Sequence, residues 1–421
     1  MTEPTAANVS NLRVNGERLW ARHMALARIG AIDGDGSCRL ALSAEDSEAR
    51  ALFASWCHDA GLLLRSDRAG NMFATRPGQI ADLPVIAAGS HLDTQPHGGR
   101  FDGISGVLAA LEVIETLNDA GVATLAPLAV VNWTNEEGVR FAPGLLGSSW
   151  YVGAVSDSAL DAVRGSDGAI FGEEVRARGW CGEAGQRSMP MEAFFELHIE
   201  QGPLLEALGK QIGIVTSIQG LRWLDVCVTG VDGHAGTTPL DHRQDALLCA
   251  ARMLVGLNEA GRAFGADARV SVGRLRTATD GPSTIVGEAS FVIDIRHPDA
   301  EVLARLCARC TEVCQEVAMS SDCTVTLAER LSIPPKHFDD SCVAALEHAA
   351  VGLGYSFVRM ASGALHDAST IAAIAPAAMV FVPCRDGISH NVREYASPED
   401  LAAGATVLLH AMLEKAGIAG R

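Results

Sequence analysis

Apolar segments with the length of buried strands lead, one after another, to a histidine or an acidic residue. Three of them are Leu83–Ala88, Ala126–Trp133 and Ala193–Ile199. The first leads to His91, the second to Glu136 and Glu137, and the third carries His198 near its end. Helical periodicity over 103–120 separates the first two strands, and this alternation is typical of an α/β domain. Because ligands of such domains bind beyond the carboxyl ends of strands, we expect a polar site there.

The pattern of apolar residues changes from about Ser217. Four strands and two helices are predicted in the order βαββαβ, which is the ferredoxin-like split unit. The strands are Leu224–Thr229, Arg269–Leu275, Ala289–Arg296 and Cys323–Ala328, and the helices cover 243–260 and 299–319. After the linker Ile333-Pro334-Pro335 the α/β pattern resumes, with a last helix opened by Ser397. The sequence therefore predicts an α/β domain with a mixed sheet flanked by helices, at 1–216 and 333–421, and an inserted ferredoxin-like domain at 217–332.

Size and composition restrict the class of protein. A chain of 421 residues exceeds what one hydrophobic core usually organises, in agreement with two domains. Its net charge of −18 argues against nucleic-acid binding, which needs clustered Lys and Arg. No run approaches about 18 uninterrupted apolar residues, and no secretory signal is visible at the N-terminus. The 11 scattered cysteines favour a reducing compartment, so we expect a cytoplasmic protein.

Histidines and acidic residues with the chemistry of metal ligands are spread along the α/β part. They are His91, Asp102, Glu136, Glu137, His198 and His390. Imidazole and carboxylate are the usual ligands of Zn²⁺, Mn²⁺ and similar ions. Each residue alone has an ordinary explanation, since a histidine at a strand end usually belongs to the surface or core. Their joint occurrence beyond successive strands favours a site for two cations that share one carboxylate.

Four longer motifs identify a family that the chain resembles. They are NEEGVRFAPGLLGS, ELHIEQGP, GHAGTTP and GISHN, and they begin at Asn135, Glu196, Gly233 and Gly387. The chain resembles, from about Gly16 to its last helix, the bimetallic amidohydrolases of the aminoacylase/carboxypeptidase superfamily. This branch includes N-carbamoyl-L-amino-acid hydrolase, β-ureidopropionase and allantoate amidohydrolase.

The resemblance implies a role for each residue of the α/β domain that matches a family motif. His91, Asp102 and His198 would bind one divalent cation (Zn, Mn or Co). Asp102, Glu137 and His390 would bind a second, so that Asp102 bridges the two. Glu136 matches the catalytic base. The resemblance also implies that Asp93 orients a ligand imidazole, that His366 lies behind the ligands, that Gln201 contacts the substrate, and that the Asp102–Gly103 peptide is cis.

The resemblance gives the inserted domain a part in the reaction as well. His234 matches a histidine that closes over the substrate's carbonyl oxygen, and Arg296 matches an arginine that holds the substrate's carboxylate. Ser283 replaces an asparagine that helps this arginine in relatives, which leaves the identity of the substrate open. In the family the inserted domain acts as a lid and mediates dimerisation, so a homodimer is expected.

The predicted function is metal-dependent hydrolysis of the carbamoyl amide of an N-carbamoyl amino acid, of either α or β type. The products would be the amino acid, carbon dioxide and ammonia. Two alternatives remain open at this point. One is hydrolysis of allantoate, which the same ligands support. The other is a metal-binding homologue without activity, against which the presence of Glu136 argues. The predicted partner is a small molecule with a carboxylate, with no nucleic acid and no membrane.

Overall fold

The computed structural model describes residues 9–419, which form two compact units. The first unit combines the chain up to Thr216 with the chain from Phe338 onward, and the second unit is Ser217–His337. The second unit therefore ends after the expected position 332. The reason is that its last long strand continues to Ile333 and is followed by the short strand β15 (Lys336–His337).

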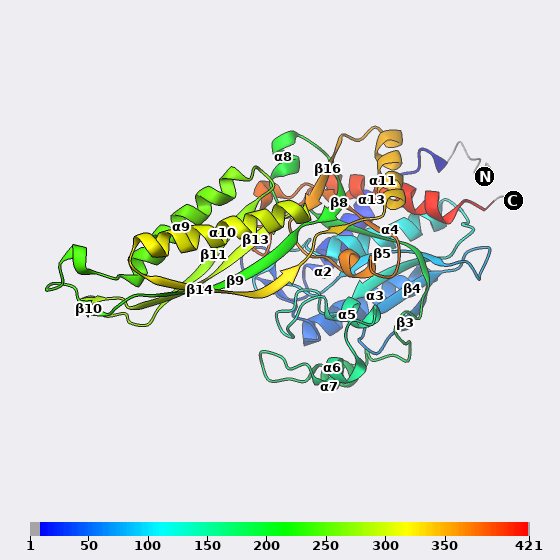
Figure 1. The fold of residues 1–421 in the computed structure, drawn as a ribbon. Coiled ribbons are helices and arrows are strands. Elements are labelled where there is room, and N and C mark those ends of the chain that lie inside the picture. Colours follow the sequence, from blue (N-terminus) through cyan, green and yellow to red (C-terminus); the bar gives the residue numbers. More distant parts are fainter. Residues whose placement is uncertain (1–8, 420–421) are drawn as a thin grey trace. The chain divides into compact units, whose positions relative to one another are not determined.

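A mixed sheet forms the centre of the first unit (Figure 1). Its strands are β3 (Leu63–Ser66), β4 (Met72–Arg76), β5 (Val85–His91), β6 (Leu128–Trp133), β7 (Met191–Ile199), β8 (Ile212–Ile218), β16 (Phe357–Ser362) and β17 (Ala377–Val382). They lie in the order β8-β17-β7-β5-β6-β4-β3, and β16 also pairs with β8. The central strands β17, β7, β5 and β6 are parallel, whereas β8, β4 and β3 run antiparallel to their neighbours.

The parallel strands are apolar because both faces of the sheet are covered. All residues of β5, β6 and β17 are buried, as expected for strands that contact helices on both sides. One layer consists of α2 (Gly16–Leu26), α4 (Ile104–Asp119), α11 (Asp340–Leu353) and α13 (Pro398–Ala416), which pack together and against β5, β7 and β17. The other helices are α3 (Ala44–Asp59), α5 (Leu146–Tyr151), α6 (Asp157–Ala162), α7 (Phe171–Ala177), α8 (Leu204–Leu208), α12 (Asp367–Ile371) and the 3-10 turn η2 (Arg385–Gly387). A small hairpin, β1 (Ala31–Ile32) and β2 (Gly36–Ser37), completes the unit.

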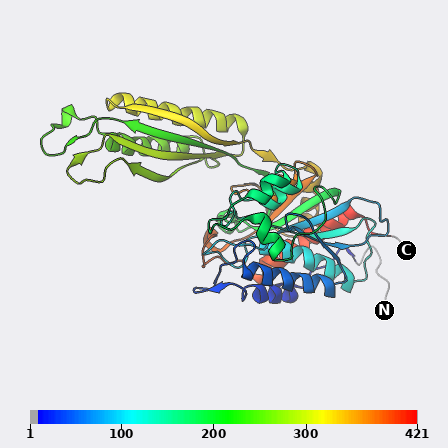
Figure 2. The ribbon, with the colours of Figure 1, turned by 90° about the horizontal axis from the view of Figure 1, so that it is seen from below.

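The second unit is a four-stranded antiparallel sheet with two helices. The elements are β9 (Gly220–Thr229), α9 (Ala246–Ala263), β11 (Arg269–Thr277), β13 (Glu288–His297), α10 (Ala300–Ser320) and β14 (Thr324–Ile333). Two-residue strands β10 (Gly233–His234) and β12 (Thr284–Ile285) and the turn η1 (Leu240–His242) extend from it. The strand order is β11-β13-β9-β14, and α9 and α10 pack side by side on the sheet (Figures 1 and 2). This is the order of elements that the sequence predicts.

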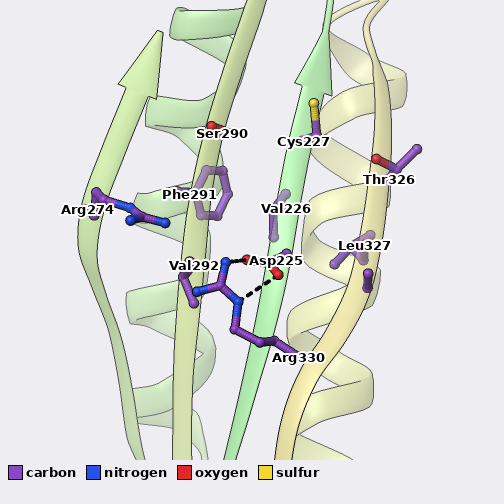
Figure 3. A pocket seen from close by; sticks show the side chains of 11 residues that line it. Asp225, Val226, Cys227, Arg274, Ser290, Phe291, Val292, Thr326, Leu327 and Arg330 are labelled. Atoms are coloured by element: carbon purple, nitrogen blue, oxygen red, sulfur yellow. Dashed lines mark hydrogen bonds and ion pairs between the residues drawn. The ribbon is translucent and has the colours of Figure 1, made fainter. Parts of the chain in front are cut away.

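The other face of this sheet carries a shallow pocket of about 310 Å³ (Figure 3). Arg330 lies across it and forms a bidentate ion pair with Asp225, with nitrogen–oxygen distances of 2.6 and 2.9 Å. None of the residues that line this pocket belongs to the motifs named above. This pocket is therefore not the site formed by the predicted metal ligands. Among residues 9–419, no helix is long and apolar enough to cross a membrane.

Candidate active site

The carboxyl ends of the parallel strands bring the predicted residues of the first unit together. His91 is the last residue of β5, and His198 is the last but one of β7. The neighbouring strand β6 ends at Trp133 and leads into the turn that carries Glu136 and Glu137. Asp102 directly precedes Gly103, the N-cap of α4, and His390 lies in the loop that follows β17. Because β6, β5, β7 and β17 are adjacent and parallel, these side chains meet at one edge of the sheet.

Two groups of three side chains can each hold a metal ion, and Asp102 belongs to both. His91, Asp102 and His198 form one group, and Asp102, Glu137 and His390 form the other, with ligand atoms within 4.8 Å of one another in each group. The two carboxylate oxygens of Asp102 face different groups. Oδ1 lies 3.0 Å from His198 Nε2 and 3.8 Å from His91 Nε2, and Oδ2 lies 3.3 Å from His390 Nε2. This is the arrangement of a bridging carboxylate.

The hydrogen bonds around these residues fit divalent cations. His91 Nδ1 donates to the carbonyl oxygen of Asp93 and His198 Nδ1 to that of Ile199, each at 2.9 Å. Their Nε2 atoms are therefore directed to the cluster, as in ligand histidines. Glu137 Oε1 is buried without a hydrogen-bond partner, which is costly unless a ligand occupies it. A set of imidazole nitrogens and carboxylate oxygens suits Zn²⁺, Mn²⁺ or Co²⁺.

Burial and charge within the cluster shift the pKa values of its own residues. Burial raises the pKa of Glu136 well above its usual range, and the charges of Asp367, Glu137 and Asp102 add to this effect. Burial, with Asp102, also raises the pKa of Glu137 to about 8. His198 behaves oppositely: burial alone would lower its pKa, but the hydrogen bond with Asp102 raises it to about 9. A carboxyl group with a raised pKa that lies 3.5 Å from His91 Nε2 is placed to transfer protons, which is the predicted role of Glu136.

Asp93 is buried in the cluster, but its carboxylate does not orient His91 as expected. The nearest contact of that carboxylate with His91 Nδ1 is 3.9 Å, and the backbone carbonyl of Asp93 accepts the imidazole hydrogen bond instead. The carboxylate accepts the backbone N–H groups of Glu136 and Glu137, at 3.3 and 3.2 Å. The prediction was wrong in this detail because the turn after His91 brings the carbonyl closer to the ring than the side chain.

Two further residues predicted from the sequence also lie in the cluster. Gln201 Nε2 donates to Asp102 Oδ2 at 2.8 Å, and its Oε1 is buried without a partner. The ring of His366 packs edge-on against that of His198, with 4.5 Å between ring centroids, and its Nε2 lies 3.0 Å from Ser362 Oγ. Gln201 therefore offers a carbonyl oxygen at the site, and His366 supports His198 from behind.

Several supporting residues were not predicted. Glu394 Oε1 accepts the backbone N–H groups of Phe101 and Asp102 at 3.0 Å, and Ser389 Oγ lies 3.0 Å from both Asp102 Oδ2 and Glu394 Oε2. Gln95 Nε2 donates to Glu137 Oε2 at 2.6 Å. Glu394 follows the motif GISHN, and Gln95 follows His91 closely in the sequence. The amino-acid sequence alone does not distinguish a side chain that supports the cluster from an exposed one.

Glu196, His198 and His366 form a third group with the spacing of metal ligands. The carboxylate of Glu196 is already satisfied, because Ser90 Oγ donates to one oxygen at 2.6 Å and Ala368 N to the other at 2.8 Å. This group therefore acts as a support for His198 and not as a further cation site.

The predicted residues of the second unit lie at two positions. His234 and Ser283 are neighbours at β10 and β12, and Arg296 lies on β13. His234 on β10 pairs with Thr284 on β12, and the carbonyl of Ser283 accepts Ala235 N at 2.8 Å. His234 Nδ1 accepts Gly236 N at 3.0 Å, so the hydrogen of the neutral ring lies on Nε2 and can be donated. Arg296 on β13 donates to both oxygens of Asp294 at 2.9 Å.

Comparison with known proteins identifies the family of the chain. Residues 87–414 match Peptidase family M20/M25/M40, and the chain belongs to this family. It is a hydrolase that acts on amide bonds.

Two similar relatives are named as amidohydrolases of N-carbamoyl-L-amino acids and of allantoate. An N-carbamoyl-L-amino-acid amidohydrolase of Rhizobium meliloti is 42% identical over 98% of this chain and 99% of its own length. An allantoate amidohydrolase of Bacillus subtilis is 33% identical over 91% of this chain and 93% of its own. The solved structure of an amidase of the hydantoinase/carbamoylase family from Burkholderia multivorans is 44% identical, covers 96% of this chain and 98% of its own, and superposes with a TM-score of 0.93.

Gly103 offers a test of the cluster that does not alter a ligand. The Asp102–Gly103 peptide is trans, not cis as the resemblance implied, and Gly103 has a φ of 69°. A Cβ at this position would overlap the imidazole of His91. We expect Gly103→Ala to raise the dissociation constant for Mn²⁺ at least about 10-fold, as measured by calorimetric titration, because His91 is displaced.

Gly121→Ala is the matched control, since Gly121 has a φ of 63° but a Cβ added there would meet no other atom within 4 Å. The control carries the same backbone strain without touching a ligand. Equal cation affinity in the two variants would contradict the role of His91.

Proposed function

We propose that the protein is a metal-dependent amidohydrolase that cleaves the carbamoyl amide of an N-carbamoyl amino acid. The observation that carries the proposal is the pair of three-residue groups that share Asp102, with Glu136 beside them. The names of the most similar relatives support the substrate class. The products are the amino acid, carbon dioxide and ammonia.

Glu136 moves the proton in this reaction. Divalent cations held by the two three-residue groups that share Asp102 would supply a bound water of lowered pKa and a Lewis acid for the substrate's carbonyl group. Glu136 accepts the proton of the attacking water and returns it to the departing nitrogen. The backbone of Glu136 is held by Asp93, which fixes the direction from which its carboxylate approaches. Gln201 Oε1, which has no other partner, is available to an N–H of the ureido group.

The second unit contributes the contacts with the rest of the substrate. We assign to His234 the donation of its Nε2 hydrogen to the oxyanion that forms at the attacked carbon. Arg296 binds the substrate's carboxylate, for which a guanidinium is suited because it donates two parallel hydrogen bonds. Ser283, which lies beside His234, is assigned a contact with the carboxylate end of the substrate.

The second unit also acts as a lid and as a dimerisation surface in this proposal. Its helix α9 exposes apolar side chains, among them Leu248 (49% exposed) and Val255 (62%). Solvent exposure of large apolar side chains on one helix favours burial against a partner. A homodimer by light scattering supports this arrangement, and a monomer at micromolar concentration excludes it.

A substrate panel tests the proposed function directly. Ammonia release is measured with N-carbamoyl α-amino acids, N-carbamoyl-β-alanine and allantoate, after chelation and after addition of Mn²⁺, Co²⁺ or Zn²⁺. We expect activity only with added cation and the highest kcat/KM on an N-carbamoyl amino acid. A higher kcat/KM for allantoate would show that allantoate is the substrate. Full activity in metal-free protein would contradict the two-cation mechanism.

Glu136→Gln separates the base from the ligands. The change removes the proton acceptor but leaves Glu137, so we expect kcat to fall at least about 10²-fold with unchanged cation content. Steady-state kinetics and elemental analysis measure the two quantities. A variant with near-normal kcat would show that Glu136 is not the base.

Arg296→Lys tests recognition of the carboxylate. Lysine keeps the charge but loses the paired hydrogen bonds, so KM for an N-carbamoyl amino acid should rise about 10-fold or more. KM for the corresponding carboxamide, which has no carboxylate, should change less than twofold. Arg330→Lys is the control, because Arg330 lies on the same sheet and is also paired with an aspartate. An equal effect on both substrates would contradict the assignment.

A further inference from the structure

We infer that Arg50 of α3 is a positioning residue for catalysis, which holds the Glu136 turn through the side chain of Thr134. The inference rests on the proposed role of Glu136 as the base. Arg50 and Thr134 are both fully buried, and neither belongs to the cluster of candidate ligands.

The guanidinium of Arg50 makes three hydrogen bonds in three directions. Nε donates to Asp46 Oδ2 at 2.8 Å, Nη1 donates to the carbonyl oxygen of Gly70 at 2.7 Å, and Nη2 donates to Thr134 Oγ1 at 3.1 Å. A planar group fixed at three points has no rotational freedom left. Thr134 is therefore tied to the first turn of α3 and to the loop between β3 and β4.

Thr134 is held at every polar atom that it has. Its backbone N–H donates to Asn71 Oδ1 at 2.9 Å, its carbonyl accepts a hydrogen bond from Gly147 N at 2.9 Å, and its hydroxyl oxygen accepts one from Arg50 Nη2. Asn71 is itself fixed, because its Nδ2 donates to Asp67 Oδ2 at 2.8 Å and to the carbonyl of Gly147 at 3.0 Å. The last residue before the turn is thus an anchored point.

The turn that follows has a strained entry and fixed contacts. Asn135 has a φ of 60°, which is unfavourable for a residue other than glycine, and its Nδ2 donates to the carbonyl of Phe141 at 2.7 Å. The carbonyl of Glu136 accepts Leu145 N at 2.8 Å, and Asp93 accepts the N–H of Glu136. Since both ends of the turn are held, a shift of Thr134 is transmitted to the carboxylate of Glu136.

A purely structural role predicts a different outcome from a positioning role. A buried guanidinium needs a counter-charge, which Asp46 supplies in an ion pair with both side chains fully buried. That ion pair and the bond to Gly70 remain when only the hydroxyl of Thr134 is removed. A structural role of Arg50 would then lower stability alone, whereas a positioning role lowers turnover.

Thr134→Val removes the hydroxyl and keeps the shape of the side chain. We expect kcat to fall about 10- to 100-fold at saturating Mn²⁺, with KM changed less than about threefold, because the base is displaced but substrate contacts are not. Thr134→Ser restores the hydroxyl and should recover most of kcat. Thr116→Val is the control, since the buried hydroxyl of Thr116 donates to Glu112 at 2.9 Å, one turn earlier on α4 and away from the Glu136 turn. Its kcat should equal that of the wild type.

Coupling to Glu136 decides between the inference and a general effect on the fold. If Thr134 acts through the base, Thr134→Val should reduce kcat less than about twofold in the Glu136→Gln background. A full additional loss there, a wild-type kcat for Thr134→Val, or complete recovery of that variant by excess Mn²⁺ would each overturn the inference. A normal kcat for Glu136→Gln alone would instead show failure of the proposed function, so the two failures are distinguishable.

Discussion

The crowding of buried carboxylates around Asp102 is the constraint on which the rest of the structure depends. Glu136, Glu137 and Glu394 all lie near this residue, and burial together with repulsion by neighbouring carboxylates, that of Asp102 in every case, raises the pKa of each. Asp102 itself is ionised, because hydrogen bonds with His198 and His390 outweigh its burial and hold its pKa well below the usual range. Negative charge at this density is stable only beside positive charge. The chemistry of cation binding follows from this arrangement.

The fold holds these side chains by hydrogen bonds from the backbone more than by packing. Four parallel strands end at the cluster, and hydrogen bonds to backbone groups such as those of Thr94 and Glu136 hold the turns just beyond them. Glu394 binds the backbone before α4, Asp93 binds the backbone after β6, and carbonyl groups orient the rings of His91 and His198. Reactive side chains are thus placed by a rigid scaffold while the ligand atoms themselves stay available.

The sequence predicts the centre of this structure better than its periphery. The strands β5, β6 and β7 were predicted because they are apolar and lead to polar motifs, and the second unit was predicted from its βαββαβ order. The strands β3, β4, β8 and β16 were missed, and β3, whose residues alternate between exposed and partly buried, lacks a clear apolar run. The cluster residues were predicted from motifs, whereas Glu394, Gln95 and the true contacts of Asp93 depend on how the turns fold, which no local pattern encodes.

The interrupted first unit has a consequence for how the chain folds during synthesis. Residues 217–337 are continuous and carry their own core, so they can fold as soon as they leave the ribosome. The first unit must wait, because β17 and α13 complete its sheet and its helix layer from the far end of the chain. Folding of the second unit lowers the entropic cost of completing the first unit. The ends of the second unit meet where Ser217 pairs with His337, so the first unit has to close a short loop and not a long one. The insertion thereby favours assembly of the domain that it divides, because it holds the two separated parts of that domain's chain close together.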